Sequence, residues 1–490
     1  MPTTLYIDGA WTTALDGGTR DIHCPANGEF VATVDEASEA DTVAAIEAAR
    51  RAFDSGVWSS VPAAQRGALL TATAATIRER KEEFARAESD DTGKRIVESR
   101  IDMDDIANCF DYFGRIADSE AGRVVDAGDP AVRAKIVYEP VGVCALITPW
   151  NYPLLQTAWK VAPALAAGNS FVLKPSELTP HTAILLMEVL DDLGLPAGVG
   201  NLVLGAGATA GAPLSTHRDV DLVSFTGGLV TGRHLMANAA ATVKKVALEL
   251  GGKNPNVVFA DADFDAALDN ALNGAFIHSG LVCSAGSRLI VEESIAPRFV
   301  DELVRRAEAI RLGGPYDERA QTGPLISAAH RDKVTAYVEK GVAEGARVRC
   351  GGRWGEGELE KGFYYLPTVI DQVHTGMSVV QDEGFGPVVT VETFTTEDEA
   401  VALANDTIYG LAGAVWTQDA GRSERIASRL RHGTIWINDF GPYLPQAEWG
   451  GFKQSGFGRE LGPTGLAEYL EAKHIYHNTE PAVTDWFAED

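Results

Sequence analysis

The spacing of apolar and polar positions predicts a helical region near the start of the chain. Over residues 41–53, 62–88 and 102–117, apolar residues recur three and four positions apart between charged ones. This is the periodicity of an amphipathic helix. The segment before residue 41 is instead rich in strand and turn signals. We therefore expect strands and turns first, followed by a group of helices.

From residue 141 onward, short apolar runs alternate with helical stretches. Such runs are typical of strands buried on both faces, and their alternation with helices indicates a parallel α/β sheet. They lie at residues 141–147, 170–173, 201–204, 222–225 and 246–250. A second α/β series follows from residue 256 to about residue 413. Its amphipathic helices lie near residues 263–277, 296–310 and 328–344.

Two lobes are the simplest account of these two series, and turn residues at 251–255 place the boundary between them. Residues 121–139 and the tail from Lys473 have no helical period. Neither segment is able to bury itself alone, so we expect a partner subunit to cover both.

Composition and charge exclude several classes of protein. The chain has 490 residues, which is more than one hydrophobic core usually serves, and 45% of them are hydrophobic. Its 42 basic and 69 acidic side chains give a net charge of −27. A field of that sign repels phosphate backbones and anionic lipids, so we expect no nucleic-acid partner and no membrane surface.

The cysteines and the N-terminus favour a cytoplasmic location. Five cysteines are scattered without a CxxC pair, which suits neither a zinc site nor a disulfide framework. The N-terminal residues lack the basic start and apolar stretch of a signal peptide, and no run approaches the ~18 apolar residues of a membrane span. We expect a reducing compartment and no transition metal.

Cys283 is the first candidate for chemistry. It stands in IHSGLVCSAGS, where small neighbours leave room for a substrate. A thiol with a pKa of about 8.5 is only a few per cent thiolate at neutral pH, so a nucleophilic role requires local donors or positive charge. The alternative is a buried cysteine that acts as a small hydrophobe.

Glu249 and Asn151 are two further candidates, each with an alternative. Glu249 interrupts an apolar strand directly before a Gly-Gly turn, so it is either a strand-end salt bridge or a general base tuned by partial burial. Asn151 ends the rigid segment ITPWN. Its amide either satisfies a turn or donates to a developing oxyanion.

Three segments could contact a nucleotide. The turn GAGATAG at 205–211 has the wrong spacing for a dinucleotide fingerprint, whereas Gly227 and Gly232 follow a strand and would open a helix whose amides can face a pyrophosphate. Lys174 and Glu177 can grip a ribose diol, and the carboxylate would repel a 2′-phosphate. The alternative for these residues is ordinary turn chemistry between strand and helix.

Taken together and in this order, these segments resemble the aldehyde dehydrogenase superfamily over essentially the whole chain. The segments that carry the resemblance are TPWN at 148–151, KPSE at 174–177, FTG with Gly232, ELGGKNP from Glu249, the stretch around Cys283, EGFGPV at 383–388 and WGGFKQSGFGRELG at 449–462.

The resemblance implies an α/β subunit of three parts. A Rossmann-like NAD-binding domain would comprise residues 1–120 and 141–251, and an α/β catalytic domain would comprise residues 252–455. A small β oligomerisation arm would comprise residues 121–140 and 470–490, and would join subunits into a homodimer or homotetramer.

The resemblance also implies roles for the candidate residues. Cys283 would attack a small aldehyde, Asn151 would help to form the oxyanion hole, and Glu249 would activate the water that releases the carboxylic acid. NAD is the expected cofactor, with NADP as an alternative and a monovalent cation near Asp91 left open. The residues implied at the cofactor are Thr148, Trp150, Lys174, Glu177, Gly207, Gly227, Gly228, Gly232, Glu383 and Phe385.

Within the superfamily, ITPWNYPLLQTAWK and WINDFGPY resemble the betaine aldehyde dehydrogenase branch. Aromatic faces recognise a quaternary ammonium group, and Tyr152, Trp159 and Trp449 are the candidates. Aminoaldehydes or other small aldehydes are the alternative substrates, in which case the rings are plain hydrophobic walls. Two positions depart from the usual pattern: Gly228 stands where serine is common, and Leu281 where glutamine is common.

Two hypotheses of another class stay open at this point. One is a binding or structural protein that keeps the fold without activity. The other is a thiol esterase that uses the same cysteine without a cofactor.

Overall fold

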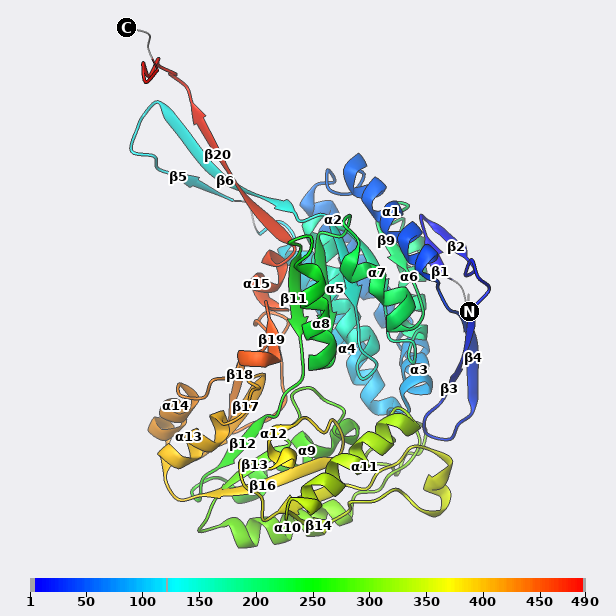
Figure 1. Ribbon diagram of the computed structural model, residues 1–490, viewed down its shortest axis with the longest axis vertical. Helices are drawn as coiled ribbons and strands as arrows, with labels where there is room; N and C mark the ends of the chain where they lie inside the picture. Colours follow the sequence, from blue (N-terminus) through cyan, green and yellow to red (C-terminus); the bar gives the residue numbers. More distant parts are fainter. Residues whose placement is uncertain (1–4, 120–121, 488–490) are drawn as a thin grey trace.

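The computed structural model describes residues 5–119 and 122–487. Among these residues, strands form sheets of eight, seven, three and two strands. The two larger sheets lie in separate lobes, each covered by helices, and a thin strand-built arm extends away from the body (Figure 1). None of the helices described is long and apolar enough to cross a membrane.

The eight-stranded sheet forms the centre of one lobe. Its strands, in spatial order, are β19 (Gly456–Phe457), β11 (Lys245–Glu249), β10 (Leu222–Thr226), β7 (Val143–Ile147), β8 (Ser170–Lys174), β9 (Gly200–Leu202), β1 (Leu5–Ile7) and β2 (Ala10–Thr12). The five strands from β11 to β9 are parallel, which confirms the prediction from the alternating pattern. The carboxyl ends of parallel strands meet at one edge, where open α/β sheets bind ligands.

Helices surround this sheet. They are α1 (Glu39–Ser55), α2 (Ala63–Glu79), α3 (Lys81–Thr92), α4 (Ile96–Ile116), α5 (Pro153–Ala167), α6 (His181–Asp192), α7 (Ala212–Thr216) and α8 (Leu229–Ala239). The helical stretch expected over residues 62–88 is divided at Arg80, whose ψ of 19° leaves the helical range. The Arg80 guanidinium there binds Glu83 and Glu188.

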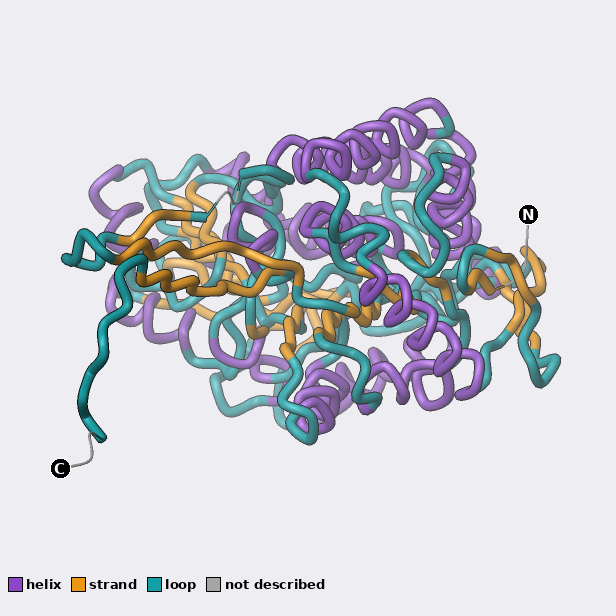
Figure 2. Tube along the Cα trace, turned by 90° about the horizontal axis from the view of Figure 1, so that it is seen from above, coloured by secondary structure: helices purple, strands orange, loops and turns teal. Residues whose placement is uncertain are grey.

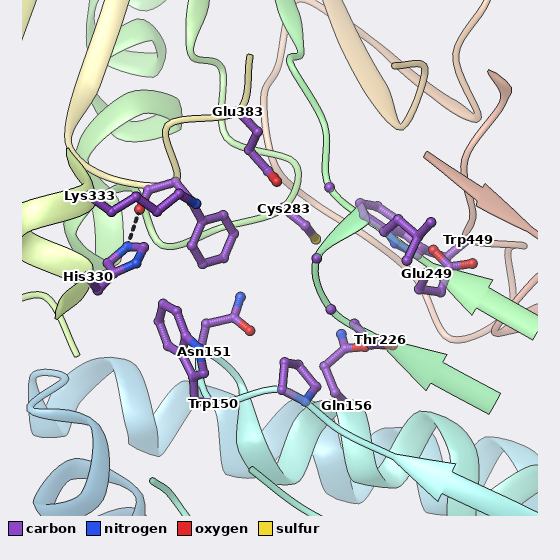
Figure 3. A pocket seen from close by; sticks show the side chains of 16 residues that line it. Trp150, Asn151, Gln156, Thr226, Glu249, Cys283, His330, Lys333, Glu383 and Trp449 are labelled. Atoms are coloured by element: carbon purple, nitrogen blue, oxygen red, sulfur yellow. Dashed lines mark hydrogen bonds between the residues drawn. The ribbon is translucent and has the colours of Figure 1, made fainter. Parts of the chain in front are cut away.

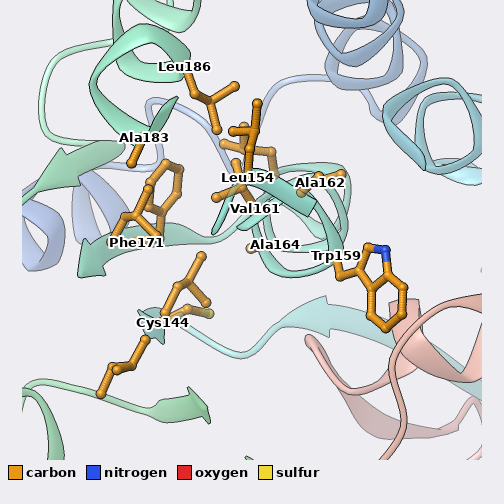
Figure 4. Close-up of a cluster of buried hydrophobic side chains, with 14 of the residues drawn as sticks. Cys144, Leu154, Trp159, Val161, Ala162, Ala164, Phe171, Ala183 and Leu186 are labelled. Carbon is orange, nitrogen blue, oxygen red and sulfur yellow. The ribbon is translucent and has the colours of Figure 1, made fainter. Parts of the chain in front are cut away.

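All residues of α5 are buried, which fixes the segment that precedes it. Figure 4 shows α5 side chains such as Leu154 and Val161 beside Phe171 of β8 and Leu186 of α6. Fully burying a side chain of this kind stabilises the fold by about 1.5–3 kcal/mol. The core therefore holds the start of α5, and with it residues 150–152, at the edge of the sheet.

The seven-stranded sheet forms the second lobe. Its strands, in spatial order, are β14 (Arg347–Cys350), β15 (Thr368–Asp371), β16 (Val388–Phe394), β13 (Arg288–Glu292), β12 (Pro255–Val258), β17 (Ala412–Trp416) and β18 (Thr434–Ile437). All neighbouring pairs except β14 and β15 are parallel. The second α/β series thus extends to β18, beyond the limit near residue 413 that the apolar pattern predicted.

The helices of the second lobe include the three that the periodicity predicted, with bounds that differ by one or two residues. They are α9 (Phe264–Phe276), α10 (Ala296–Glu308), α11 (Ala328–Ala343), α12 (Ser378–Gln381), α13 (Glu397–Asn405) and α14 (Ala420–Ala427). A further short helix, α15 (Gly462–Ala467), packs against α5.

The arm is a three-stranded sheet of β5 (Arg123–Val125), β6 (Val132–Pro140) and β20 (Leu470–Asn478). β6 and β20 pair over their full length, from Pro140 with Leu470 to Val132 with Asn478. Figure 2 shows these strands side by side, and Figure 1 shows them extending away from the helices. Both segments expected to be extended therefore form strands. The remaining hairpin pairs β3 (Thr19–His23) with β4 (Phe30–Asp35).

The division into three domains stays a prediction. The eight-stranded sheet draws β19 from residues 456–457, beyond the range assigned to the NAD-binding domain. Residues 1–4, 120–121 and 488–490, which belong to the predicted ranges, lie outside the described residues.

Candidate active site

A cavity of about 240 Å³ lies at the edge of the eight-stranded sheet, where β7, β10 and β11 end. Asn151, Glu249 and Cys283 all line it. Figure 3 shows Trp150 and His330 on one side of this cavity and Glu249 and Trp449 on the other. The structure thus brings together the three side chains that the sequence suggested for catalysis.

A second cavity of about 350 Å³ shares Gln156, Cys283 and Trp449 with the first. Its other walls include the aromatic residues Tyr152, Trp159, Phe440 and Tyr443 and the carboxylates of Asp102 and Asp105. Because Cys283 lines both cavities, its thiol lies where they meet. A group bound in either cavity can therefore reach the sulfur.

Cys283 lies in the loop before β13, and Asn254 Nδ2 donates to its carbonyl oxygen at 2.9 Å. Burial, together with the nearby carboxylates of Glu249 and Glu383, raises the pKa of the thiol to about 12. The backbone N–H groups of Ser284 and Cys283 oppose this rise. The thiol is therefore protonated at neutral pH, and a nucleophilic role requires a base that removes the proton.

Asn151 lies two residues before the start of α5 and is 5% exposed. Its Nδ2 donates to the carbonyl oxygen of Leu281 at 2.9 Å, two residues before Cys283. One amide hydrogen is used in this contact. The amide has a second hydrogen, which is available to an oxygen atom bound in the cavity.

Glu249 ends β11 and is 5% exposed, and its Oε2 has no hydrogen-bond partner in the part of the chain that the structure describes. Burial raises the pKa of this carboxyl group well above its ordinary value, and Glu460 raises it further. Lys160 and Arg459 oppose the rise. Glu249 is thus a buried acid with a free oxygen and a raised pKa, as general bases often are.

The sequence analysis missed the ion pair behind Glu249. Lys160 on α5 binds the carboxylate of Glu460, and both side chains are buried. Glu460 is held in place by paired backbone bonds with Trp449, at 2.7 and 2.8 Å. A lysine as the one charged residue of a mostly apolar helix was the signal that could have revealed this pair.

Several residues suggested for the cofactor line the first cavity: Trp150, Gly227, Gly228, Glu383 and Phe385. The Trp150 ring meets the Phe385 ring edge-on at 5.4 Å. Glu383 Oε1 accepts a bond from the Gly252 N–H at 3.1 Å, and burial raises the pKa of Glu383 to about 7.

Gly232 lies in α8, where a Cβ would fall 2.5 Å from the Leu250 side chain. Glycine at this position therefore allows α8 to approach the segment that follows Glu249. The sequence analysis had suggested this glycine for the pyrophosphate, but Gly232 is not among the residues that line the cavity.

The remaining cofactor candidates lie beside the first cavity rather than in its walls. The Thr148 N–H donates to the Lys174 carbonyl oxygen at 3.1 Å. Lys174 Nζ lies 3.8 Å from Glu177 Oε2. Gly207 begins a turn of π-helix, 207–211, and a Cβ on Gly211 would touch the Lys174 side chain at 3.4 Å. These residues form one cluster at the same edge of the sheet.

The suggested substrate residues all line the second cavity, together with a ring that sequence reasoning missed. Trp159 lies 5.2 Å from Tyr443 and 5.8 Å from Trp449, between ring centroids. Tyr443 also donates to Asp105. Tyr152 differs from this group because the Lys94 ammonium lies 4.1 Å from its ring centroid and already occupies one face.

The monovalent cation near Asp91, which the sequence left open, is not tested by this structure. The Asp91 carboxylate accepts from the backbone N–H of His181 at 3.0 Å and contacts His181 Nδ1 at 2.5 Å. A cation at Asp91 would have to compete with this imidazole. Over residues 5–119 and 122–487, no group of three or more His, Cys, Asp or Glu side chains could hold a metal ion.

Comparisons with known proteins show which family this chain is similar to. The model of the aldehyde dehydrogenase family matches residues 11–475. The chain is 55% identical to betaine aldehyde dehydrogenase of Bacillus subtilis (strain 168), over 99% of this chain and 100% of that protein. It is 44% identical to the peroxisomal aminoaldehyde dehydrogenase 1 of Pisum sativum, over 99% of this chain and 97% of that protein.

Among solved structures, this chain is similar to betaine aldehyde dehydrogenases. A betaine aldehyde dehydrogenase variant from Staphylococcus aureus, crystallised with NAD+, superimposes with a TM-score of 0.99 at 52% identity, and the match covers 100% of each chain. The expected α/β fold is thereby confirmed. From its sequence, its fold and the residues around Cys283, this chain belongs to the aldehyde dehydrogenase family.

Proposed function

We propose that this protein oxidises betaine aldehyde to glycine betaine, with NAD+ as the oxidant. The observation that carries the proposal is the position of Cys283 at the junction of two different cavities. One has glycines and a carboxylate suited to a nucleotide, and the other has aromatic rings and carboxylates suited to a cation. A reaction at the sulfur can therefore involve both ligands at once.

The residues beside the first cavity fit a dinucleotide. Lys174 and Glu177 offer a cation and a carboxylate to a ribose, and the N-terminal amides of α8 follow Gly227 and Gly228. Glycine at position 251 leaves room for Glu383, because a Cβ there would fall 2.0 Å from Glu383 Oε2. NAD+ supplies the acceptor for the hydride that leaves the aldehyde carbon. Glu177 favours NAD over NADP, which carries an additional phosphate.

The proposed reaction uses three side chains of this chain. The Cys283 thiol gives up its proton to a water molecule as its sulfur adds to the aldehyde carbon, while Asn151 Nδ2 and the Cys283 N–H donate to the carbonyl oxygen. After oxidation, the acyl group is held as a thioester on Cys283. Glu249 then takes a proton from water, the water oxygen adds to the acyl carbon, and the carboxylic acid leaves with the thiol restored.

The second cavity supports a cationic substrate. A quaternary ammonium group has no proton to donate, so its binding depends on ring faces, each worth about 0.5–2 kcal/mol. Trp159, Tyr443 and Trp449 form a cluster of three such rings, and Asp105 adds a carboxylate. The Bacillus subtilis relative is named betaine aldehyde dehydrogenase, which is the activity proposed for this chain.

Aminoaldehydes are the second candidate substrates. A protonated amine can donate hydrogen bonds, and the carboxylates of Asp102 and Asp105, which line the second cavity, can accept them. The Pisum sativum relative is named for this activity.

We also propose that the protein forms a homo-oligomer and is located in the cytoplasm. The exposed apolar residues Val124 and Tyr476 on the arm favour a homodimer or homotetramer formed through β5, β6 and β20. The absence of paired cysteines favours the cytoplasm.

A matched pair of aldehydes tests the substrate. In 3,3-dimethylbutanal a carbon atom replaces the quaternary nitrogen of betaine aldehyde, so the two differ in charge and little in shape. With NAD+ and the purified protein, we expect kcat/KM for betaine aldehyde to be at least about tenfold higher, as one or two cation–π contacts would give. Equal values would contradict the proposal. A panel with 3-aminopropanal distinguishes the second candidate, and Cys283→Ala serves as the inactive control.

A further inference from the structure

The backbone just before the nucleophile loop is left-handed over three consecutive residues. His278 has φ of 46°, Ser279 of 53° and Gly280 of 67°. For residues other than glycine this region is sparsely populated, and it persists only where the surroundings hold it. Such a run directly before Cys283 therefore requires an explanation.

Hydrogen bonds from other segments hold this turn. The Ser279 N–H donates to Thr322 Oγ1 at 2.8 Å, and the His278 N–H donates to Glu98 Oε1 at 3.2 Å. On its other side, the turn packs so closely on the loop after Glu383 that a Cβ at Gly280 would fall 2.3 Å from the Gly386 carbonyl oxygen. Contacts with three other segments, at Glu98, Thr322 and Gly386, thus stabilise the strained turn.

The conformation aims the His278 ring at the Asn151 segment. His278 Nε2 donates to the backbone carbonyl oxygen of Asn151 at 2.8 Å. In the opposite direction, the Asn151 side chain donates to the Leu281 carbonyl oxygen at 2.9 Å. The two bonds form a reciprocal clamp between the segment that carries the amide and the loop that carries the thiol.

The His278 ring can act as a hydrogen-bond donor at neutral pH without carrying a charge. Burial holds the pKa of His278 well below its ordinary value, and the nearby Lys94 lowers it further, so the imidazole is neutral. A carbonyl oxygen can only accept, so the single proton lies on Nε2. The Tyr152 ring meets the imidazole edge-on at 5.3 Å and fixes its orientation.

From these contacts we infer that His278 is a positioning residue that sets the distance between the Asn151 amide and the Cys283 sulfur. The inference rests on the proposed aldehyde oxidation and adds to it. It assigns a role to a histidine that does not line either cavity. Oxyanion donors act only when they are held in place, and a shift of about 1 Å can cost about a hundredfold in rate.

Two variants of matched size and flexibility test the clamp. His278→Gln keeps a donor near the position of Nε2, whereas His278→Met removes it, and both residues meet the same strain at φ of 46°. For the methionine variant we expect kcat/KM for the aldehyde to fall by about tenfold to a hundredfold, with the KM for NAD+ within about twofold of wild type. For the glutamine variant we expect kcat/KM within about threefold of wild type. Equal losses in both variants, or none in His278→Met, would overturn the inference.

A measurement that needs no turnover keeps this test separate from the proposed function. Hydrogen–deuterium exchange of residues 281–284 should be faster in His278→Met than in His278→Gln, because only the former lacks the clamp. Equal exchange would overturn the inference, whereas a wild-type protein that oxidises no aldehyde would overturn only the proposed function.

The inference also remains testable if His278→Met does not fold. His278→Asn then replaces it, since asparagine tolerates a left-handed backbone but is too short to reach the Asn151 carbonyl. We expect a Tm close to that of wild type with a kcat/KM at least about tenfold lower. A wild-type kcat/KM in this variant would overturn the inference.

Discussion

The Tyr443 hydroxyl donates a hydrogen bond to Asp105 Oδ2 at 2.9 Å, and both residues line the second cavity. Asp105 belongs to α4 and Tyr443 to the segment after β18, so the contact joins parts of the chain that are 338 residues apart. Burial raises the pKa of Asp105, and the bond from Tyr443 opposes this rise. The bond thus keeps a negative charge beside the aromatic cluster.

Replacing this charge should weaken cationic substrates selectively. In Asp105→Asn the shape is kept and the charge is lost, so we expect the KM for betaine aldehyde to rise about tenfold, which corresponds to about 1.4 kcal/mol. Neutral 3,3-dimethylbutanal serves as the control and should change less than about twofold. A similar rise for both aldehydes would show that Asp105 acts through packing rather than charge.

The reactivity of Cys283 should depend steeply on pH. Because burial raises the pKa of the thiol to about 12, the thiolate is a minor form below that pH. In the protein without cofactor, the rate of alkylation by iodoacetamide should increase about tenfold per pH unit from neutral pH upward, with no plateau near pH 8.5. Mass spectrometry of the Cys283 peptide gives the rate. A plateau near 8.5 would mean an ordinary, solvated thiol.

Loss of the Glu249 carboxylate should slow the hydrolytic half of the reaction. We expect Glu249→Gln to lower steady-state turnover by about 10²–10⁴-fold, the usual contribution of a general base. Rapid mixing should still show an initial burst of NADH, because oxidation precedes the step that Glu249 serves. Loss of the burst together with turnover would instead place Glu249 in the oxidative half.

A substitution at Gly251, which lies against Glu383, tests whether the first cavity binds NAD+. In Gly251→Ala the new methyl group would fall 2.0 Å from Glu383 Oε2 and displace the carboxylate. We expect the KM for NAD+ to rise about tenfold or more, with a smaller change in the KM for the aldehyde. Titration of the protein with NAD+ by tryptophan fluorescence checks the binding directly. An unchanged affinity would remove Glu383 from the proposed cofactor site.

The pair formed by Asp91 and His181 leads to a prediction about monovalent cations. Since the imidazole already contacts the Asp91 carboxylate at 2.5 Å, K+ gains little by binding there. At equal ionic strength, Tm in potassium chloride and in Tris chloride should agree within about 2 °C. A clear rise in Tm with K+ alone would show that the cation displaces His181.

Local patterns in the sequence predicted much of the fold and the reacting groups. The apolar runs predicted the five central parallel strands of the first sheet, because strands buried on both faces are mostly apolar. Cys283, Glu249 and Asn151 each lie in a short segment whose neighbours suggested chemistry. Asn151 and Glu249 approach one cavity because β7 and β11 end at a common edge, whereas Cys283 reaches it from the loop before β13 of the other sheet.

Pairs that depend on tertiary contacts could not be predicted in this way. Lys160 and Glu460 are 300 residues apart, and nothing near either residue indicates the other. Asp105 lies in the amphipathic helix that the periodicity predicts over residues 102–117, and its exposure to the second cavity depends on how α4 packs against α5. The left-handed turn at His278 was missed because its strain is supported by distant residues rather than by local sequence.

The short strand β19 has a consequence for biosynthesis. It pairs with Leu248 and Glu249 at the edge of β11, although it comes from residues 456–457, near the end of the chain. During translation, the strand that ends in Glu249 therefore lacks this neighbour until residues 456–457 have left the ribosome, more than 200 residues later. A nascent chain that stalls before residue 456 contains the thiol, the amide and the acid but lacks the strand that borders Glu249, so catalytic competence should require the synthesis of residues 456–457.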